Sequence, residues 1–157
     1  MPGKPRPEQV ADRIAIDDLL DAYARAIDTK DWDGLRTLFT HDALLDYTHE
    51  GGVRGDIEEA IAWLSKALEP FAMCQHIVAN RRVTIDGDEA TVHAYVFSPL
   101  GLPDGLGGLT IVLSGGEYDD RLRRTPDGWR FASRTARSAW FHAGLKGLAQ
   151  PPIAQRG

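Results

Sequence analysis

The segment Ala26-Ile-Asp-Thr-Lys-Asp-Trp-Asp33 separates two predicted helices and sets the helix-first order of this chain. Asp28 lies where the first helix ends. Asp31 is placed to cap the second, because an aspartate side chain accepts hydrogen bonds from the free N–H groups at a helix start. His76 opens a long strand-like run further along the chain. If the fold brings Asp28 and His76 together, a carboxylate orients a histidine that can take a proton from carbon.

Apolar residues on both sides of this segment recur at helical spacing. They predict a first helix from about Pro7 to Asp28 and a short second helix that begins at Trp32. A third helix is predicted from Asp56 to Leu68, where Asp56 and Glu59 resemble a capping pair. All the predicted helices therefore lie in the first half of the chain.

After Pro70 the pattern changes to β-branched and aromatic runs, which are typical of strands. The predicted strands, including one short run before the third helix, span residues 43–47, 76–85, 90–97, 109–124 and 129–141. Turn sequences between neighbouring strands favour hairpins. Helices first and a meandering sheet last indicate an α+β fold, in which a bent antiparallel sheet wraps around three N-terminal helices.

Composition excludes several classes of protein. The 157 residues are 43% hydrophobic and 26% charged, which is ordinary for a soluble globular domain. A net charge of −5 without a basic run argues against nucleic acid. No apolar stretch reaches membrane-spanning length, and the start lacks the apolar core of a signal peptide. The single cysteine, Cys74, suits a reducing cytoplasm. We expect a cytoplasmic protein with a disordered arm (1–7), one domain (8–143) and a C-terminal tail (144–157).

Five short phrases resemble those of one superfamily. They are Asp28-Thr-Lys-Asp-Trp-Asp33, Leu45-Asp-Tyr47, Gln75-His76, Gly115-Gly-Glu-Tyr118 and Asp127-Gly-Trp-Arg-Phe131. On these phrases the chain resembles the SnoaL-like branch of the nuclear transport factor 2-like superfamily. Within that branch it is similar to scytalone dehydratase, bile-acid dehydratase and hexachlorocyclohexane dehydrochlorinase. The resemblance implies a cone-shaped, cystatin-like α+β fold with a central pocket.

The same resemblance implies roles for three residues. Asp28 and His76 match the family's catalytic dyad, and Tyr47 matches a tyrosine that polarises the substrate carbonyl through water. The chain departs from the fungal dehydratase elsewhere. Ile27 replaces a second tyrosine, residues 98–102 contain no histidine, and the substrate-binding serine and asparagine are missing. The proton-abstracting pair is kept while the recognition set is not, which leaves elimination and isomerisation both open.

The predicted pocket is mostly apolar and suits a small hydrophobic or cyclic substrate. The residues predicted to line it are Tyr23, Trp32, Trp63, Phe71, Asn80, Phe97, Tyr118 and Trp140. The glycine- and proline-rich segment Pro99–Gly108 is expected to form a loop or lid at its mouth. The other histidines lack the spacing of metal ligands, so we expect neither a metal nor another cofactor.

Three functions are compatible with these residues. The first is a lyase that dehydrates or dehydrohalogenates a cyclic substrate. The second is a cyclase or isomerase of the polyketide or steroid type. The third is a non-catalytic small-molecule binding module, because Asp28 also suits a helix end and a histidine such as His76 is often a core residue. A dyad favours the first function over the third, since a silent module has no need of one.

Self-association is also expected. The dehydratases that the chain resembles are trimers, and exposed aromatic residues on sheet faces need to be covered. The residues that carry this argument are Trp129, Phe131, Trp140 and Phe141. We therefore expect a homotrimer or a homodimer.

Overall fold

The structure is a computed structural model that describes residues 7–148, apart from the side chains at 8, 143 and 145–148. Its helices are α1 (Pro7–Thr29), α2 (Trp32–Thr37), the short 3₁₀ turn η1 (Thr48–Glu50) and α3 (Ile57–Leu68). Its strands are β1 (Phe39–Asp46), β2 (Arg54–Gly55), β3 (Met73–Cys74), β4 (Ile77–Asp86), β5 (Glu89–Pro103), β6 (Leu109–Thr125) and β7 (Gly128–Leu148). The predicted α+β class is confirmed. The predicted arm (1–7) is corrected at Pro7, which begins α1, while residues 1–6 and the part of the predicted tail beyond Leu148 lie outside the described residues.

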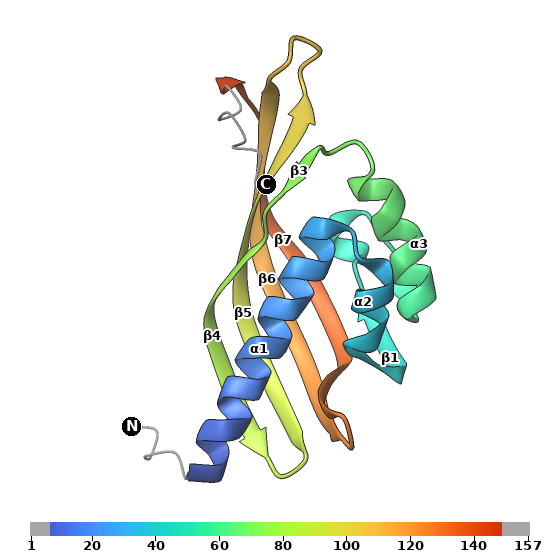
Figure 1. Cartoon of the computed structure of the whole chain (residues 1–157), viewed down its shortest axis with the longest axis vertical. Coiled ribbons are helices and arrows are strands. Elements are labelled where there is room, and N and C mark those ends of the chain that lie inside the picture. The colour runs from blue at the N-terminus through green and yellow to red at the C-terminus, as the bar shows by residue number, and fades with distance from the viewer. Residues whose placement is uncertain (1–6, 149–157) are drawn as a thin grey trace, which may run out of the picture.

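The sheet is curved, and the helices lie against one side of it (Figure 1). Its strand order is β2-β1-β7-β6-β5-β3, and β4 also pairs with β5. The strand pairs run antiparallel except for β1 and β7, which run parallel. The predicted antiparallel sheet is thus corrected to a mixed sheet. Short turns enforce antiparallel pairing only between consecutive strands, and β1 and β7 are far apart in the sequence.

The end of α1 fixes the position of Asp28. Lys30 adopts a left-handed backbone with φ 56°, and its N–H donates to the Ile27 carbonyl at 3.1 Å. The Asp31 N–H donates to the Ala26 carbonyl at 2.8 Å, which completes a Schellman motif. Asp28 therefore lies in the last turn, where the helix dipole disfavours a carboxylate by about 0.3–1 kcal/mol. Helix stability does not account for this aspartate.

Both predicted N-caps are present. The Asp31 side chain accepts a hydrogen bond from the Gly34 N–H at 2.9 Å. The Asp56 side chain accepts from the N–H groups of Glu58 and Glu59, and the Glu59 side chain accepts in return from the Asp56 N–H. These caps fix where α2 and α3 begin, and α3 in turn presents its apolar side to the interior.

The segment predicted as a loop is mostly strand. Residues 99–103 continue β5 and pair with residues 109–113 of β6, so only the turn between Pro103 and Leu109 departs from the ladder. Pro99 is tolerated because the ladder uses its carbonyl, which accepts from the Gln75 N–H at 3.1 Å. The resulting β5–β6 hairpin projects beyond the helices (Figure 1).

The last strand also corrects two expectations. β7 continues to Leu148, so the first residues of the predicted tail belong to the sheet. Trp129 and Phe131 are not exposed, because they point toward the helices and are 4% and 0% accessible. Trp140 and Phe141 are 48% and 65% accessible. Only this second pair still supports the argument for self-association. No helix in residues 7–148 is long and apolar enough to cross a membrane.

Candidate active site

The structure brings Asp28 and His76 together. His76 lies between β3 and β4, opposite the last turn of α1. Its Nδ1 is 2.7 Å from Asp28 Oδ1, and its backbone N–H donates to both carboxylate oxygens at 3.0 Å. The side chains of His76 and Asp28 are only 11% and 22% accessible. Three contacts therefore hold one carboxylate on one imidazole, although the two residues come from different elements.

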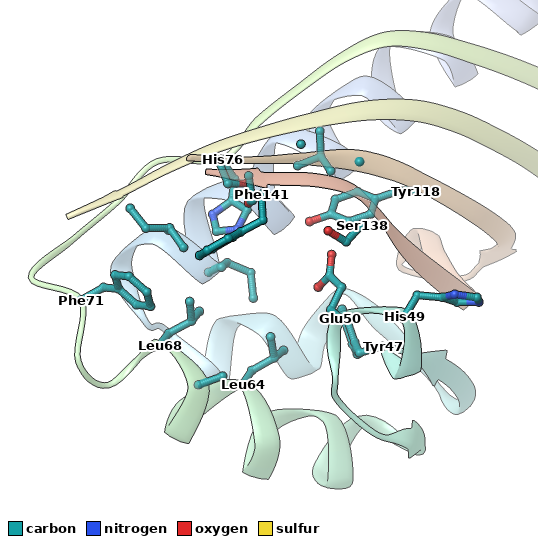
Figure 2. A pocket seen from close by; sticks show the side chains of 18 of the residues that line it. Tyr47, His49, Glu50, Leu64, Leu68, Phe71, His76, Tyr118, Ser138 and Phe141 are labelled. Atoms are coloured by element: carbon teal, nitrogen blue, oxygen red, sulfur yellow. The ribbon is translucent and has the colours of Figure 1, made fainter. Parts of the chain in front are cut away.

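This contact determines which nitrogen of His76 can act as a base. An ionised carboxylate only accepts hydrogen bonds, so the Nδ1 beside it carries the ring proton. Nε2 then keeps its lone pair, and no described residue donates a hydrogen bond to it. His76 lines a cavity (Figure 2). The arrangement presents an unprotonated, oriented nitrogen to whatever occupies that cavity.

The cavity encloses about 390 Å³, a volume within the range of small-molecule sites. Its walls come from α1, η1, α3 and the inner faces of β5, β6 and β7, with His76 on the β3–β4 connection (Figure 2). Most of the wall is apolar, including Leu64, Leu68 and Phe71. Hydroxyl groups from tyrosine and serine residues interrupt it. Such a wall favours a largely apolar molecule with a few oxygen atoms.

Two tyrosine hydroxyls meet on this wall. The hydroxyl oxygens of Tyr23 and Tyr47 are 2.8 Å apart, and either can donate to the other. The Tyr47 ring stacks on Trp63 with ring centroids 5.4 Å apart. Burial raises the pKa of the Tyr47 hydroxyl well above its ordinary range, although the charge of Arg134 opposes part of that rise. Tyr47 therefore stays protonated at physiological pH and can donate a hydrogen bond.

Arg134 supplies a positive charge behind the cavity wall. Its side chain is fully buried, and Nε and Nη2 each donate to Asp120 at 2.7 Å. Its guanidinium carbon lies 3.7 Å from the centre of the Tyr23 ring and 4.2 Å from that of Tyr118. Nη1 is the one buried side-chain polar atom of the described residues without a hydrogen bond. Sequence reasoning missed this ion pair, because Arg134 lies among β-formers and its partner comes from another strand.

Four of the eight residues predicted as pocket walls line the cavity, together with Tyr47 and His76. The four are Tyr23, Trp63, Phe71 and Tyr118, whereas Trp32 packs against the core and does not reach the cavity. Asn80 is exposed at an irregularity of β4, with φ 51°. Phe97 and Trp140 also lie outside. Inward-facing residues of β5 alternate as Ala94, Val96 and Ser98, which turns Phe97 to the outer face, where it meets Trp140 with centroids 5.9 Å apart.

Glu50 is a cavity residue that sequence reasoning missed. It is the last residue of η1, and its carboxylate points into the cavity toward Tyr118 and Ser138 (Figure 2). Enclosure by the walls raises the pKa of the Glu50 carboxyl. The only sequence signal was an acidic residue between the predicted site tyrosine, Tyr47, and the Gly51-Gly52 pair.

A second histidine–aspartate pair lies outside the cavity. His93 Nδ1 is 2.9 Å from Asp119 Oδ1, and the two side chains are 37% and 44% accessible. Arg137 also donates to Asp119. Both residues belong to the outer face of the sheet, in paired positions of β5 and β6. This pair provides an internal control for the one in the cavity.

Residues 8–135 match the family model of the SnoaL-like domain. The chain belongs to the SnoaL-like domain family. An uncharacterized protein of Mycobacterium tuberculosis (strain ATCC 25618 / H37Rv) is 36% identical over 126 residues, which cover 80% of this chain and 84% of that protein. The membership confirms the superfamily that the sequence phrases indicated.

Solved structures share the fold over nearly the whole chain. LinA is 25% identical with a TM-score of 0.77, covering 92% of this chain and 96% of that one. A type 2 LinA, a hexachlorocyclohexane dehydrochlorinase, is 22% identical with a TM-score of 0.76, covering 93% and 97%. A candidate scytalone dehydratase of Novosphingobium aromaticivorans DSM 12444 is 19% identical with a TM-score of 0.75, covering 95% and 97%. The last two likenesses show the fold alone.

Proposed function

We propose that this protein is a cofactor-independent lyase in which His76 takes a proton from carbon in a mostly apolar, cyclic substrate. One observation carries the proposal: a histidine held by a carboxylate through Nδ1 at 2.7 Å lines a largely apolar cavity. The dehydrochlorinase and dehydratase folds it resembles are consistent with this chemistry. The largely apolar cavity also supports the binding of a small hydrophobic molecule.

The proposed reaction begins with proton transfer to Nε2 of His76. Asp28 stabilises the imidazolium that forms, because its carboxylate already accepts the Nδ1 proton. General-base catalysis of this kind contributes about 10²–10⁴ in rate. As the carbon loses its proton, negative charge moves onto the substrate's carbonyl oxygen. Tyr47, or a water that it holds, donates a hydrogen bond to that oxygen.

The pairing of Tyr47 with Tyr23 supports this role. A hydroxyl that already has one partner is held in place and can shift its proton toward a new acceptor. The buried charge of Arg134 behind the tyrosine rings favours the accumulation of negative charge on this side of the cavity. The donors are therefore prearranged before the substrate arrives, which is what oxyanion stabilisation requires.

Two alternatives share this cavity. A cyclase or isomerase of the polyketide or steroid type starts with the same proton removal, so the dyad supports it as well. A binding module without catalysis uses only the apolar wall. The first alternative differs in the fate of the carbanion, and the second differs in whether any proton leaves the ligand at all.

Exchange of α-protons for deuterium separates a carbon base from a binding module. We would incubate cyclohexanone, α-tetralone and a keto-steroid with the protein in D₂O and follow the α-proton signals by NMR. The proposal expects exchange above background for at least one ketone, with loss of that exchange in His76→Ala and retention in His93→Ala. Exchange that is absent in the wild type, or equal in wild type and His76→Ala, would rule the proposal out.

A further inference from the structure

Glu50 has no visible structural task for its side chain. Its backbone N–H donates to the Tyr47 carbonyl at 2.9 Å and closes the η1 turn, and Gly51 caps that turn in a left-handed conformation. The carboxylate itself makes no hydrogen bond or ion pair to any residue in the described part of the chain. The residue as a whole is exposed, yet its carboxylate points into the cavity rather than away from it (Figure 2). This direction, with no partner among the described residues, points to a role toward the cavity's occupant.

The surroundings of Glu50 favour its protonated form. Although the residue as a whole is exposed, its carboxylate points into the cavity toward Tyr118 and Ser138 (Figure 2). Enclosure raises the pKa of this carboxyl, and the charge of His76 when it is protonated, together with that of Arg134, offsets only part of the rise. The other titratable groups around it are the hydroxyls of Tyr118 and Tyr47 and the imidazole of His49, which line the same cavity.

We propose that Glu50 is a second catalytic residue, which gives its proton to the leaving oxygen, and that the substrates are therefore cyclic β-hydroxy carbonyl compounds. This inference rests on the proposed function, because it assigns the second half of the same elimination. His76 and Glu50 reach the cavity from different elements, the β3–β4 connection and η1, with open space between their side chains (Figure 2). One substrate can therefore touch a base and an acid at the same time.

The step balances without any further reactant. The α-carbon–hydrogen bond breaks and its proton goes to His76 Nε2. The electron pair forms the carbon–carbon double bond, the β-carbon–oxygen bond breaks, and the departing hydroxyl takes the Glu50 proton to leave as water. The enzyme is left with an imidazolium and a carboxylate. Loss of a proton from His76 to solvent and gain of one by Glu50 restore the starting state.

The presence of an acid at this position distinguishes between leaving groups. Hydroxide is too basic to depart without a proton, so a dehydration gains from an acid in the transition state. A halide or a phenolate departs as a stable anion and gains little. A carboxylic acid poised toward the cavity is thus of use to a dehydratase and of little use to a dehydrohalogenase. On this argument, the cavity favours a hydroxyl leaving group.

Two probes with the same ring test the inference. β-Hydroxycyclohexanone releases water and β-(p-nitrophenoxy)cyclohexanone releases a coloured phenolate, and both give cyclohexenone. We expect Glu50→Gln to slow water release by about 10²-fold or more, in the range of general-acid effects, and phenolate release by less than about threefold. The matched control is Glu117→Gln, an acid on the outer face of β6, which should leave both rates unchanged.

The outcomes separate this inference from the proposed function. One outcome would support His76 as the base but overturn the role of Glu50. In it, His76→Ala loses phenolate release, while Glu50→Gln releases water as fast as the wild type does. Equal slowing of both probes in Glu50→Gln would overturn it too, because that indicates a structural effect. Failure of the wild type to act on either probe would also count against it. The α-proton exchange of cyclohexanone should be unaffected by Glu50→Gln but lost in His76→Ala.

Discussion

The cavity pair Asp28–His76 and the outer-face pair Asp119–His93 share one contact and differ in everything around it. In both, an imidazole Nδ1 lies on a carboxylate oxygen, at 2.7 Å in the cavity and 2.9 Å outside. In the cavity pair the imidazole is 11% accessible, whereas His93 is 37% accessible. A histidine–aspartate contact therefore does not by itself make a catalytic base, because the surroundings of the histidine also matter.

The two histidines differ in the charges and the solvent that surround them. Within residues 7–148, His76 supplies every hydrogen bond recorded for the Asp28 carboxylate, through its backbone N–H and its ring Nδ1. Asp119 divides its charge between His93 and Arg137, and the hydrogen bond from His93, followed by that from Arg137, lowers the pKa of its carboxyl. His76 Nε2 meets an enclosed wall with tyrosine hydroxyls, whereas the outer pair meets solvent. Water around the outer pair screens its field and competes for its proton.

The largest effect should come from breaking each pair in turn. His76→Ala should lower turnover by about 10²–10⁴, since it removes the general base, while His93→Ala should change it by less than about twofold. Asp28→Asn should cost much of the activity with the fold intact. The double variant that combines Asp28→Asn with His76→Ala should be no less active than His76→Ala alone, because the two residues act as one unit. Steady-state rates with β-(p-nitrophenoxy)cyclohexanone measure all four variants.

The same comparison applies to two neighbouring ion pairs. Arg134–Asp120 is fully buried under the cavity wall, whereas Arg137–Asp119 is about half exposed on the outer face. Arg134→Met should destabilise the protein by about 3–5 kcal/mol, because it leaves Asp120 charged and unpaired in the core. Arg137→Met should cost at most about 1 kcal/mol. Urea denaturation followed by circular dichroism measures both.

A matched double variant makes this prediction sharper. Replacing both members of the buried pair, Arg134→Met with Asp120→Leu, should recover most of the lost stability, since no unpaired charge remains. If the single and double variants unfold at the same urea concentration, the buried charge is not the cause of the loss.

The tyrosine pair should give a smaller effect. Tyr23→Phe leaves the Tyr47 hydroxyl without its buried partner, which should cost about 1–3 kcal/mol of stability. Tyr47→Phe should slow turnover less than His76→Ala does, because a water can take over part of the hydrogen bonding. Thermal denaturation and the phenolate assay, run on the same samples, measure the two effects. A Tyr47→Phe variant as inactive as His76→Ala would contradict this ranking.

The outer face also tests the prediction of self-association. Phe97 and Trp140 pack against each other there, and Ile77 is paired with Phe97 in the sheet. A second copy of the chain that covers these exposed side chains would explain them. Light scattering should give more than one chain per particle, and Phe97→Ser with Trp140→Ser should shift the particle toward one chain. One chain per particle for the wild type at micromolar concentration would refute the prediction.

The smallest effect concerns pH. Enclosure raises the pKa of Glu50 in the folded protein, so the folded state holds its proton more tightly than the unfolded state does. The stabilising contribution of protonated Glu50 is complete below its unfolded pKa, about 4.3, and is lost as pH rises through the higher folded value. The stability of Glu50→Gln relative to the wild type should therefore increase as pH rises from about 4 to about 7. Thermal melts over that range measure the difference, with Glu117→Gln as the control.

Local features of the fold were predictable because they depend on neighbouring residues. The caps at Asp31 and Asp56 follow from short-range hydrogen bonding, and the structure contains both. The parallel β1–β7 pair was not predictable, because no turn joins its strands. The straight continuation of β5 through Pro99 and Pro103 was missed, since proline and glycine were taken as loop formers while their carbonyls could still pair.

The residues of the candidate site were also only partly predictable from the sequence. The assignment of Asp28 and His76 came from family phrases, and spacing alone could not show that a helix end would meet a strand start. Phe97 was assigned to the cavity by its aromatic character, although its place between Val96 and Ser98 in an alternating strand put it on the other face. Glu50 escaped notice because a turn residue has no periodicity that reveals its direction.

The central claim is that His76 is a base for carbon rather than a wall of a binding site. One NMR titration of a cyclic ketone in D₂O reports both its affinity, from line broadening, and its α-proton exchange rate, for wild type and His76→Ala. The account predicts that the affinity changes by less than about threefold while exchange falls to the uncatalysed rate, as expected for an interaction used in the transition state. Exchange that survives in His76→Ala, or affinity and exchange that vanish together, would contradict it.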